Sequence, residues 1–314
     1  MKKQLRFIAI CFLAGCSFLM VSCKDQPEDS PENNKAASAA DSTTISVKKG
    51  YAAVNGLKMY YEVHGEGKPI VLLHGSFMNI PLNWTKTLPL LAKNRTVIVT
   101  ELQGHGRTAD IERPISFEGM ADDVSELLKF LKIDSADILG YSMGGGVAFQ
   151  IGIRHPEQVR KMIIVSGVYK HDGWLPEVEA AFATMNADQF KGTPFQTQYD
   201  SLAPDPKHFP EFVKRVISID LKPYDWTEQV KQINKPIFML MGDVDGVRYQ
   251  HAQELFRMKG GGKMGEFAGM PDSRLAILPA TMHTTMFERT DWVIPMVNEF
   301  LDAPPQVKQP AAKK

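Results

Sequence analysis

Short, almost purely apolar runs recur along the chain, and helical patterns of apolar residues separate most of them. The apolar runs are Ile70–Leu73, Val97–Thr100, Ala136–Leu139, Met162–Val165, Ile237–Met241 and Leu275–Leu278, and the helical patterns are Ser116–Leu131, Met143–Arg154, Arg248–Met258 and Asp291–Leu301. Short apolar runs of this kind are typical of buried strands. Strands that alternate with helices predict an α/β fold with a mostly parallel sheet that helices flank on both faces.

A turn signal precedes the first of these runs. Asn55-Gly56 separates the strand-like stretches Tyr51–Val54 and Leu57–Val63. Asn-Gly favours a tight hairpin because both of its residues tolerate a positive φ. We therefore expect an antiparallel hairpin ahead of the parallel sheet.

The stretch 171–234 breaks the rhythm of strands and helices. It contains many prolines and two helix-like pieces, Val178–Met185 and Phe209–Ile217, but no clear buried strand. We interpret it as a mostly helical lid inserted into an α/β core formed by 47–170 and 235–303. Such a lid would cover the C-terminal edge of the sheet, where parallel sheets bind ligands. Its aromatic residues are candidates either for lining a pocket or for packing inside the lid: Trp174, Phe182, Phe195, Tyr224 and Trp226.

The first 22 residues have the pattern of a signal peptide. A basic start, Met1–Arg6, precedes the apolar run Phe7–Val21, which at about 15 residues is too short for a comfortable spanning helix. The run ends at Ser22-Cys23, directly before a polar stretch. An apolar run, a small residue and a cysteine resemble the bacterial lipobox, and the resemblance implies that Cys23 becomes the lipidated first residue of the mature protein.

Two alternatives to this anchor stay open. Leu13-Ala14-Gly15-Cys16 also matches a lipobox, although cleavage there would leave the apolar residues 17–21 on the mature end. The apolar run could also stay uncleaved as a membrane anchor. The composition of 23–46 predicts a flexible tether, and that of 304–314 a disordered tail. We expect a lipid-anchored protein of the bacterial cell envelope, on its periplasmic face or at the cell surface.

Charge and cysteine content exclude several kinds of function. Lys+Arg and Asp+Glu both number 36, so the formal net charge is zero and nothing suggests a nucleic-acid partner. All of the cysteines lie within the first 23 residues, so the folded part has no disulfide, thiol nucleophile or Cys-based metal site. The histidines are scattered without the spacing of metal ligands, and we expect neither a metal nor a cofactor.

The motif Gly140-Tyr141-Ser142-Met143-Gly144-Gly145 lies between a predicted strand and a predicted helix. In this G-x-S-x-G pattern, the glycines let the chain turn sharply while neighbouring segments approach closely. The turn presents the Ser142 hydroxyl at the tip of the sheet, and the start of the helix directs N–H groups toward developing negative charge. We predict that Ser142 is a nucleophile.

A serine nucleophile needs a base, and the base needs an acid that orients it. His283 follows the last predicted strand, as expected from the chain order of nucleophile, acid and histidine in such sites. Asp243 and Asp245 both follow the run Ile237–Met241. The spacing from Gly242 selects Asp245 as the acid, whereas Asp243 is expected to serve the backbone of the turn.

Two N–H groups are needed to hold an oxyanion. Met143, directly after the nucleophile, can supply one of them. The other is expected from the loop His74-Gly75-Ser76-Phe77, where Ser76 is the favoured donor and Phe77 stays open. His74 lies outside the order of nucleophile, acid and histidine, and we predict that its role is structural.

These motifs, taken in order over roughly residues 50–302, resemble the α/β-hydrolase superfamily. They are Leu72-Leu73-His74-Gly75, Gln103-Gly104-His105-Gly106-Arg107, Gly140–Gly145, Gly242-Asp243-Val244-Asp245 and Met282-His283. The resemblance implies the fold, the triad Ser142–Asp245–His283 and the oxyanion hole. It is closest to the lid-bearing branch with esterases, lactonases, C–C-bond hydrolases and cofactor-free haloperoxidases. The family's haloalkane dehalogenases and epoxide hydrolases use Asp as the nucleophile, so Ser142 argues against both. Glu101 stands where the family often has Asp, in a scaffold turn.

Three functions fit these residues. The first is a serine hydrolase that cleaves a small ester, thioester or lactone through an acyl-enzyme on Ser142. The second uses the same triad to cleave a C–C bond in a diketone-like small molecule. The third is a non-catalytic lipoprotein that binds a ligand on the hydrolase scaffold. The complete triad argues against the third, because a binding module does not need all of its members.

Overall fold

The computed structural model describes residues 47–304. The predicted signal peptide 1–22, the candidate lipidation sites Cys16 and Cys23, the tether 23–46 and the tail beyond residue 304 lie outside the described residues. No helix within 47–304 is both long enough and apolar enough to cross a membrane.

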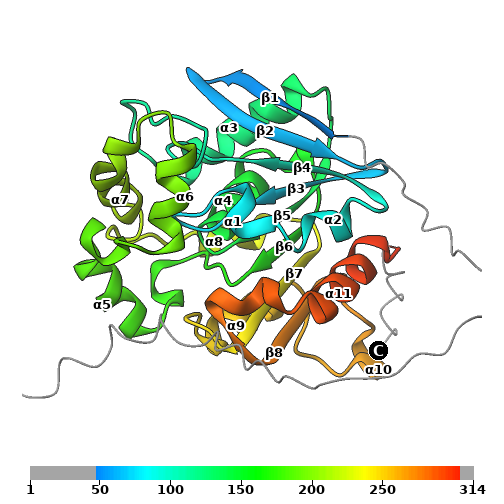
Figure 1. Cartoon of the computed structure of the whole chain (residues 1–314). Helices are drawn as coiled ribbons and strands as arrows, with labels where there is room; N and C mark the ends of the chain where they lie inside the picture. The colour runs from blue at the N-terminus through cyan, green and yellow to red at the C-terminus, as the bar shows by residue number, and fades with distance from the viewer. Residues whose placement is uncertain (1–46, 305–314) are drawn as a thin grey trace, which may run out of the picture. The chain divides into compact units, whose positions relative to one another are not determined.

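The described residues form an eight-stranded sheet in the order β1-β2-β4-β3-β5-β6-β7-β8 (Figure 1). The strands are β1 (Val47–Val54), β2 (Leu57–His64), β3 (Lys68–Leu73), β4 (Arg95–Thr100), β5 (Ala136–Tyr141), β6 (Val159–Val165), β7 (Ile237–Val244) and β8 (Arg274–Met282). β2 pairs antiparallel with both β1 and β4, whereas the pairs from β4 through β8 are parallel. The predicted, mostly parallel sheet is therefore confirmed, and each apolar run lies within a strand.

The predicted hairpin joins β1 to β2. Asn55 and Gly56 adopt φ values of 48° and 81°, and Val54 pairs with Leu57 directly across the turn. The positive φ of both turn residues is the backbone conformation that Asn-Gly favours.

Helices cover both faces of the sheet, as expected. One face carries α3 (Phe117–Phe130), α4 (Met143–Arg154), α8 (Thr227–Gln232) and α9 (Tyr249–Met258), and the other carries α1 (Ile80–Trp84), α2 (Leu88–Leu91) and α11 (Thr290–Asp302). A short helix, α10 (Gly265–Ala268), lies between α9 and β8. Because side chains alternate along a strand, Val71 and Leu73 of β3 enter the first core, whereas Ile70 and Leu72 enter the second.

Residues 171–234 connect β6 to β7 and contain helices but no strand. α5 (Pro176–Thr184), α6 (Pro194–Leu202) and α7 (Phe209–Ile217) gather together at the left of Figure 1. The two predicted helical pieces correspond to α5 and α7, whereas α6 was not predicted. The predicted lid also included α8, but this helix buries Val230 and packs against α4. α8 therefore belongs to the layer that flanks the sheet.

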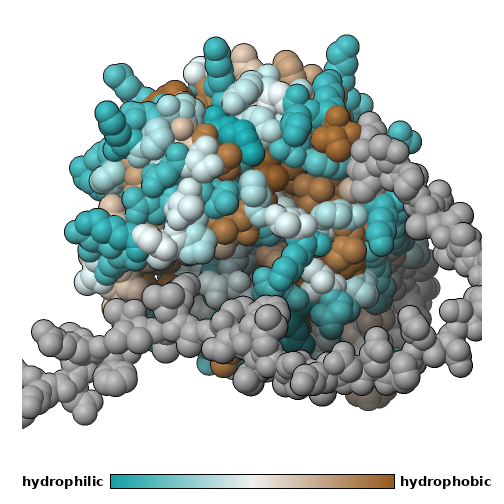
Figure 2. Space-filling view, viewed as in Figure 1, coloured by the Kyte–Doolittle hydropathy of each residue, from teal (hydrophilic) through white to brown (hydrophobic). Residues whose placement is uncertain are grey.

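The surface of this face is mostly hydrophilic. Figure 2 shows separate apolar patches toward the centre and right of the view, surrounded by hydrophilic residues. Scattered apolar surface is normal for a folded protein, so these patches alone indicate no partner.

Candidate active site

Ser142 lies in the sharp turn between β5 and α4. Its φ of 53° and ψ of −118° are a strained conformation for a residue with a side chain. The neighbouring glycines make this turn possible. A Cβ at Gly140 would lie 2.0 Å from the carbonyl oxygen of Gly144, and a Cβ at Gly144 would lie 2.2 Å from that of Leu73. The spacing of the glycines is therefore required by contacts between backbone atoms.

The three residues predicted as a triad lie together at the C-terminal ends of β5, β7 and β8. His283 Nε2 lies 3.0 Å from Ser142 Oγ, and His283 Nδ1 lies 2.8 Å from Asp245 Oδ1. With the Nδ1 proton donated to the carboxylate, Nε2 can accept the serine proton. Asp245 is buried, whereas the side chain of His283 is 29% exposed and Ser142 is half-buried. Reactants can therefore reach the serine while the acid is shielded from water.

The second carboxylate oxygen of Asp245 is held by Ser166, which the sequence did not single out. The Ser166 hydroxyl donates to Asp245 Oδ2, and the N–H of Val247 donates to Oδ1 over 3.3 Å. Burial alone would raise the pKa of the Asp245 carboxyl, but the hydrogen bond and charge of His283, followed by the Ser166 hydroxyl, lower the pKa below its ordinary value. Asp245 is therefore ionised when it faces the imidazole.

Asp243 has a different role. Its carboxylate accepts the N–H groups of Ala280 and Thr281 at 2.9 and 3.0 Å. These hydrogen bonds, first that of Thr281 and then that of Ala280, lower the pKa of Asp243. As expected, Asp243 binds backbone, but its partners are in β8 rather than in its own turn. It therefore fixes the end of the strand that leads to His283.

Two aromatic side chains position the His283 residue. The Tyr141 hydroxyl donates to the backbone carbonyl of His283 over 2.7 Å, and the two rings lie 5.2 Å apart. The indole of Trp174, from the 171–234 segment, meets the imidazole edge-on at 5.9 Å. Trp174 thus connects that segment to the reacting groups.

The loop after β3 lies against the nucleophile. A Cβ at Gly75 would lie 3.4 Å from Ser142 Cβ, and the Gly75 N–H is already donated to Asn83 Oδ1 at 3.0 Å. The N–H groups of Ser76, Phe77 and Met143 have no hydrogen-bond acceptor within residues 47–304. The predicted donors Ser76 and Met143 are therefore free to bind an oxyanion, and so is the neighbouring Phe77.

His74 lies beneath this loop and binds only backbone groups. Its Nε2 accepts the Leu102 N–H over 3.1 Å, and its Nδ1 donates to the Gly75 carbonyl over 2.9 Å. Burial lowers the pKa of His74 to about 4, so the ring is neutral near pH 7. The ring joins two loops at the edge of the site, which is a structural role.

Glu101, the residue that departs from the family pattern, is fully buried in its turn. Its carboxylate accepts the backbone N–H of Arg107 at 2.6 Å and the guanidinium of the same residue at 2.7 Å. A Cβ at Gly106 would lie 2.4 Å from the carboxylate, so the longer Glu side chain fills the turn completely. Burial raises the pKa of Glu101. The turn is built around this carboxylate and does not reach the triad.

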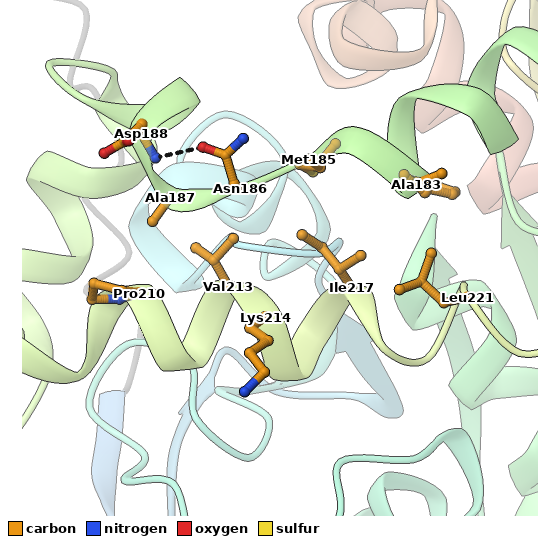
Figure 3. A pocket seen from close by; sticks show the side chains of 11 residues that line it. Ala183, Met185, Asn186, Ala187, Asp188, Pro210, Val213, Lys214, Ile217 and Leu221 are labelled. Atoms are coloured by element: carbon orange, nitrogen blue, oxygen red, sulfur yellow. Dashed lines mark hydrogen bonds between the residues drawn. The ribbon is translucent and has the colours of Figure 1, made fainter.

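A pocket of about 520 Å³ lies within the 171–234 segment, between α7 and the stretch that leads out of α5 (Figure 3). Val213 and Ile217 of α7 face Met185 and Ala187 across it. A smaller pocket of about 130 Å³ is lined by Tyr141 and by residues next to His283. No member of the triad lines either pocket, so neither volume measures the space for a reactant at Ser142.

Comparisons with known proteins place these motifs in a family. The profile of a family described as alpha/beta hydrolase fold matches residues 68–298, which is most of the chain. The match contains the Ser142 turn, the Asp245 loop and His283 in the order that the structure brings together.

Individual relatives carry several different names. The chain is 32% identical over 144 residues to 2-hydroxymuconate semialdehyde hydrolase of Pseudomonas sp. (strain CF600), and 37% identical over 117 residues to a soluble epoxide hydrolase of Corynebacterium sp. (strain C12). These matches cover 44% and 36% of this chain, and 45% and 40% of the relatives, so the chain spans less than half the length of these relatives.

A solved structure shows the same fold over a longer range. The enol-lactonase from Burkholderia xenovorans LB400 superposes with a TM-score of 0.62 at 23% identity, covering 81% of this chain and all of that one. At this identity the likeness concerns the fold alone.

Proposed function

Because the chain belongs to the α/β-hydrolase fold family, a family of hydrolases, we propose that it is a serine hydrolase. Its substrate is a small ester, thioester or lactone, and its acyl-enzyme forms on Ser142. The observation that carries the proposal is His283, which lies within hydrogen-bond distance of both Ser142 and Asp245. A nucleophile, a base and an orienting acid in contact are the arrangement that acyl transfer requires.

In this mechanism, Ser142 Oγ attacks the substrate carbonyl carbon while His283 Nε2 takes the serine proton. The carbonyl oxygen becomes an oxyanion, which the N–H groups of Met143 and Ser76 or Phe77 bind. His283 then returns the proton to the leaving group as the tetrahedral intermediate collapses. Water attacks the acyl-enzyme with His283 again as the base, and the acid product leaves. Asp245 stays ionised throughout and stabilises the imidazolium.

Cleavage of a C–C bond is the second candidate, because it needs the same triad and the same oxyanion site. The observation that favours it is the relative named for 2-hydroxymuconate semialdehyde, a compound whose name contains no ester.

Hydrolysis of p-nitrophenyl acetate, butyrate and octanoate tests the first candidate. We expect turnover that Ser142→Ala abolishes and that Ser201→Ala, at an exposed serine of α6, leaves unchanged. The dependence on chain length then measures the space for the acyl group. No turnover of any ester, together with cleavage of a diketone that Ser142→Ala abolishes, would move the C–C candidate to the front.

We also propose that α5, α6 and α7 act as a lid, and that the protein is lipid-anchored at Cys23 in the bacterial cell envelope. Trp174 and the aromatic contact of Phe212 in α7 with Phe77 support the lid, and the lipobox-like sequence supports the anchor. Metabolic labelling with palmitate tests the anchor. Cys23→Ser should remove the label while the matched variants Cys16→Ser and Cys11→Ser keep it. Loss of label in Cys16→Ser alone would move the site to Cys16.

A further inference from the structure

The residues 260–270, which we call the 260–270 loop, expose three large apolar side chains. Phe267 is 86% exposed, Met264 60% and Met270 62%. The four-residue helix α10 and several glycines make up most of the rest of the loop. Three long apolar side chains in eleven residues on a loop tip form a concentrated apolar projection, unlike the single exposed apolar residues that folded proteins tolerate.

This loop lies at the N-terminal edge of the parallel strands, and the triad lies at the other edge. The loop follows α9 and leads into Arg274, the first residue of β8. Ser273 fastens it there, because its hydroxyl accepts the N–H of Ile237, the first residue of β7, over 3.1 Å. In Figure 1, α10 lies at the lower right, away from α5, α6 and α7. A surface that contacts this loop therefore leaves the Ser142 side of the molecule free.

The chain also enters the fold at this edge. Val47 pairs with His64, which lies four residues before Lys68, the first residue of β3. A further 46 residues precede Val47, and they include the apolar run Phe7–Val21 and the lipobox-like sequence. The segment predicted to hold a lipid anchor thus joins the fold at the edge that also carries the 260–270 loop.

Basic side chains gather at the same edge. Burial lowers the pKa of Lys161; the Asp137 carboxylate opposes this effect, and the positive charges of Arg160, Lys68 and Arg274 lower the pKa further. Arg160 pairs with Asp137, and Lys161 Nζ donates to the backbone carbonyls of Phe300, Leu301 and Ala303, whereas Lys68 is exposed. Anionic lipid headgroups attract exposed basic side chains at such a surface.

The loop itself is close to neutral. It carries one base, Lys263, beside the exposed Met264, and one acid, Glu266, within α10. Neither side chain forms an ion pair with another described residue. The apolar side chains of the loop and the cations beside it are therefore separate features on one edge, as in proteins that combine insertion of apolar groups with attraction to headgroups.

We propose that the 260–270 loop docks on an anionic lipid bilayer, with Met264, Phe267 and Met270 inserted among the headgroups and upper acyl chains. Lys68 and Lys263, which are both exposed, face the headgroups. Docking at this edge holds the fold in one orientation, with the C-terminal edge of the sheet and Ser142 turned away from the membrane. The proposal does not depend on which bond the triad cleaves.

The test places a tryptophan on the loop of the full chain, purified in detergent and reconstituted into vesicles of phosphatidylcholine and phosphatidylglycerol. Bromine atoms on the acyl chains quench a tryptophan that enters the bilayer. For Phe267→Trp we expect a blue shift and strong quenching of the added emission. The control is Leu221→Trp, which replaces another exposed apolar residue, 52% exposed, in the segment at the opposite edge. The control should be neither shifted nor quenched.

Two further results test whether an anionic bilayer, and not a second copy of the chain, covers the 260–270 loop. Omission of phosphatidylglycerol, or the addition of Lys263→Glu, should reduce the quenching of Phe267→Trp. Equal quenching of the two tryptophans, or none at position 267, overturns the proposal. A blue shift of Phe267→Trp without lipid that grows with protein concentration also overturns it, because a second copy of the chain would then cover the loop.

Discussion

The turn that carries Ser142 and the helices that lie beside it differ in what determines their shape. The turn is fixed by contacts between backbone atoms, because Gly140 and Gly144 leave no room for a Cβ. The helical segment from α5 to α7 is fixed by side chains. Phe77 packs on Phe190 and Phe212, and the ring of Tyr199 stacks on that of Phe212 at 4.7 Å. Backbone contacts permit one residue type, whereas packed rings accept many of similar size.

The same substitution at two glycines is the strongest test of this difference. Gly144→Ala forces a Cβ against the Leu73 carbonyl at 2.2 Å, and we expect it to cost more than about 5 kcal/mol and to prevent folding. Gly192 of the helical segment has a φ of 72° but nothing within 4 Å of its Cβ position. Gly192→Ala should therefore cost only about 1 kcal/mol. Urea denaturation measures both, and a folded Gly144→Ala protein of ordinary stability would contradict the backbone argument.

A pair of substitutions at Phe212 tests the role of side chains in the helical segment. Phe212 is buried between Phe77 and Tyr199, and its loss in Phe212→Ala should cost about 4 kcal/mol. Phe212→Leu keeps most of the volume and should cost less than about 1.5 kcal/mol. Denaturant midpoints compare the two variants, and an equal loss of stability in both would mean that the ring geometry, and not the volume, is required.

Lowering the pH should destabilise the folded protein, because the buried ring of His74 resists protonation. Its pKa is about 4 in the folded protein and about 6.5 when unfolded, so between these values only the unfolded chain takes up the proton. The contribution of His74 to stability is therefore full above pH 6.5 and falls as the pH drops, by about 3 kcal/mol at pH 4.

Urea denaturation between pH 4 and pH 7 measures this effect. His74→Gln should remove the contribution of this ring to the pH dependence of the free energy of unfolding. The contribution of His251, whose burial lowers its pKa to about 3, should remain. An unchanged slope in His74→Gln would show that the ring at position 74 is accessible to protons.

Ser166 should show the smallest effect. Ser166→Ala removes the hydroxyl that binds Asp245 Oδ2 and leaves the longer hydrogen bonds from the N–H groups of Gly242 to Oδ2 and of Val247 to Oδ1. One hydrogen bond to a charged group is worth about 1.5 kcal/mol, which corresponds to a roughly tenfold lower kcat. We expect KM to change little because Ser166 does not reach the substrate side of His283. Initial rates give both constants, with Ser201→Ala as the control. A rise in KM with an unchanged kcat would show that Ser166 does not help to position Asp245.

The order of strands and helices, the Ser142 turn and the choice of Asp245 over Asp243 could all be read from the sequence. Each depends on local signals: apolar runs, glycine spacing, and the distance of an acid from the end of its strand. The contact of Ser166 with Asp245 could not be predicted in this way, because it joins the ends of neighbouring strands 79 residues apart in the chain. Helix α6 and the position of α8 were missed for a similar reason. Their places are set by the surfaces on which they pack, and no periodic signal of their own reveals them.

The most direct measurement of the central claim is the intact mass of the protein after reaction with a fluorophosphonate, followed by peptide mapping. A serine activated by His283 and Asp245 should form one adduct, located on Ser142. Ser142→Ala should form none, and His283→Ala should react far more slowly because the base is absent. An adduct on another residue, or equal labelling of the protein and the Ser142→Ala variant, would contradict the assignment of Ser142 as the nucleophile.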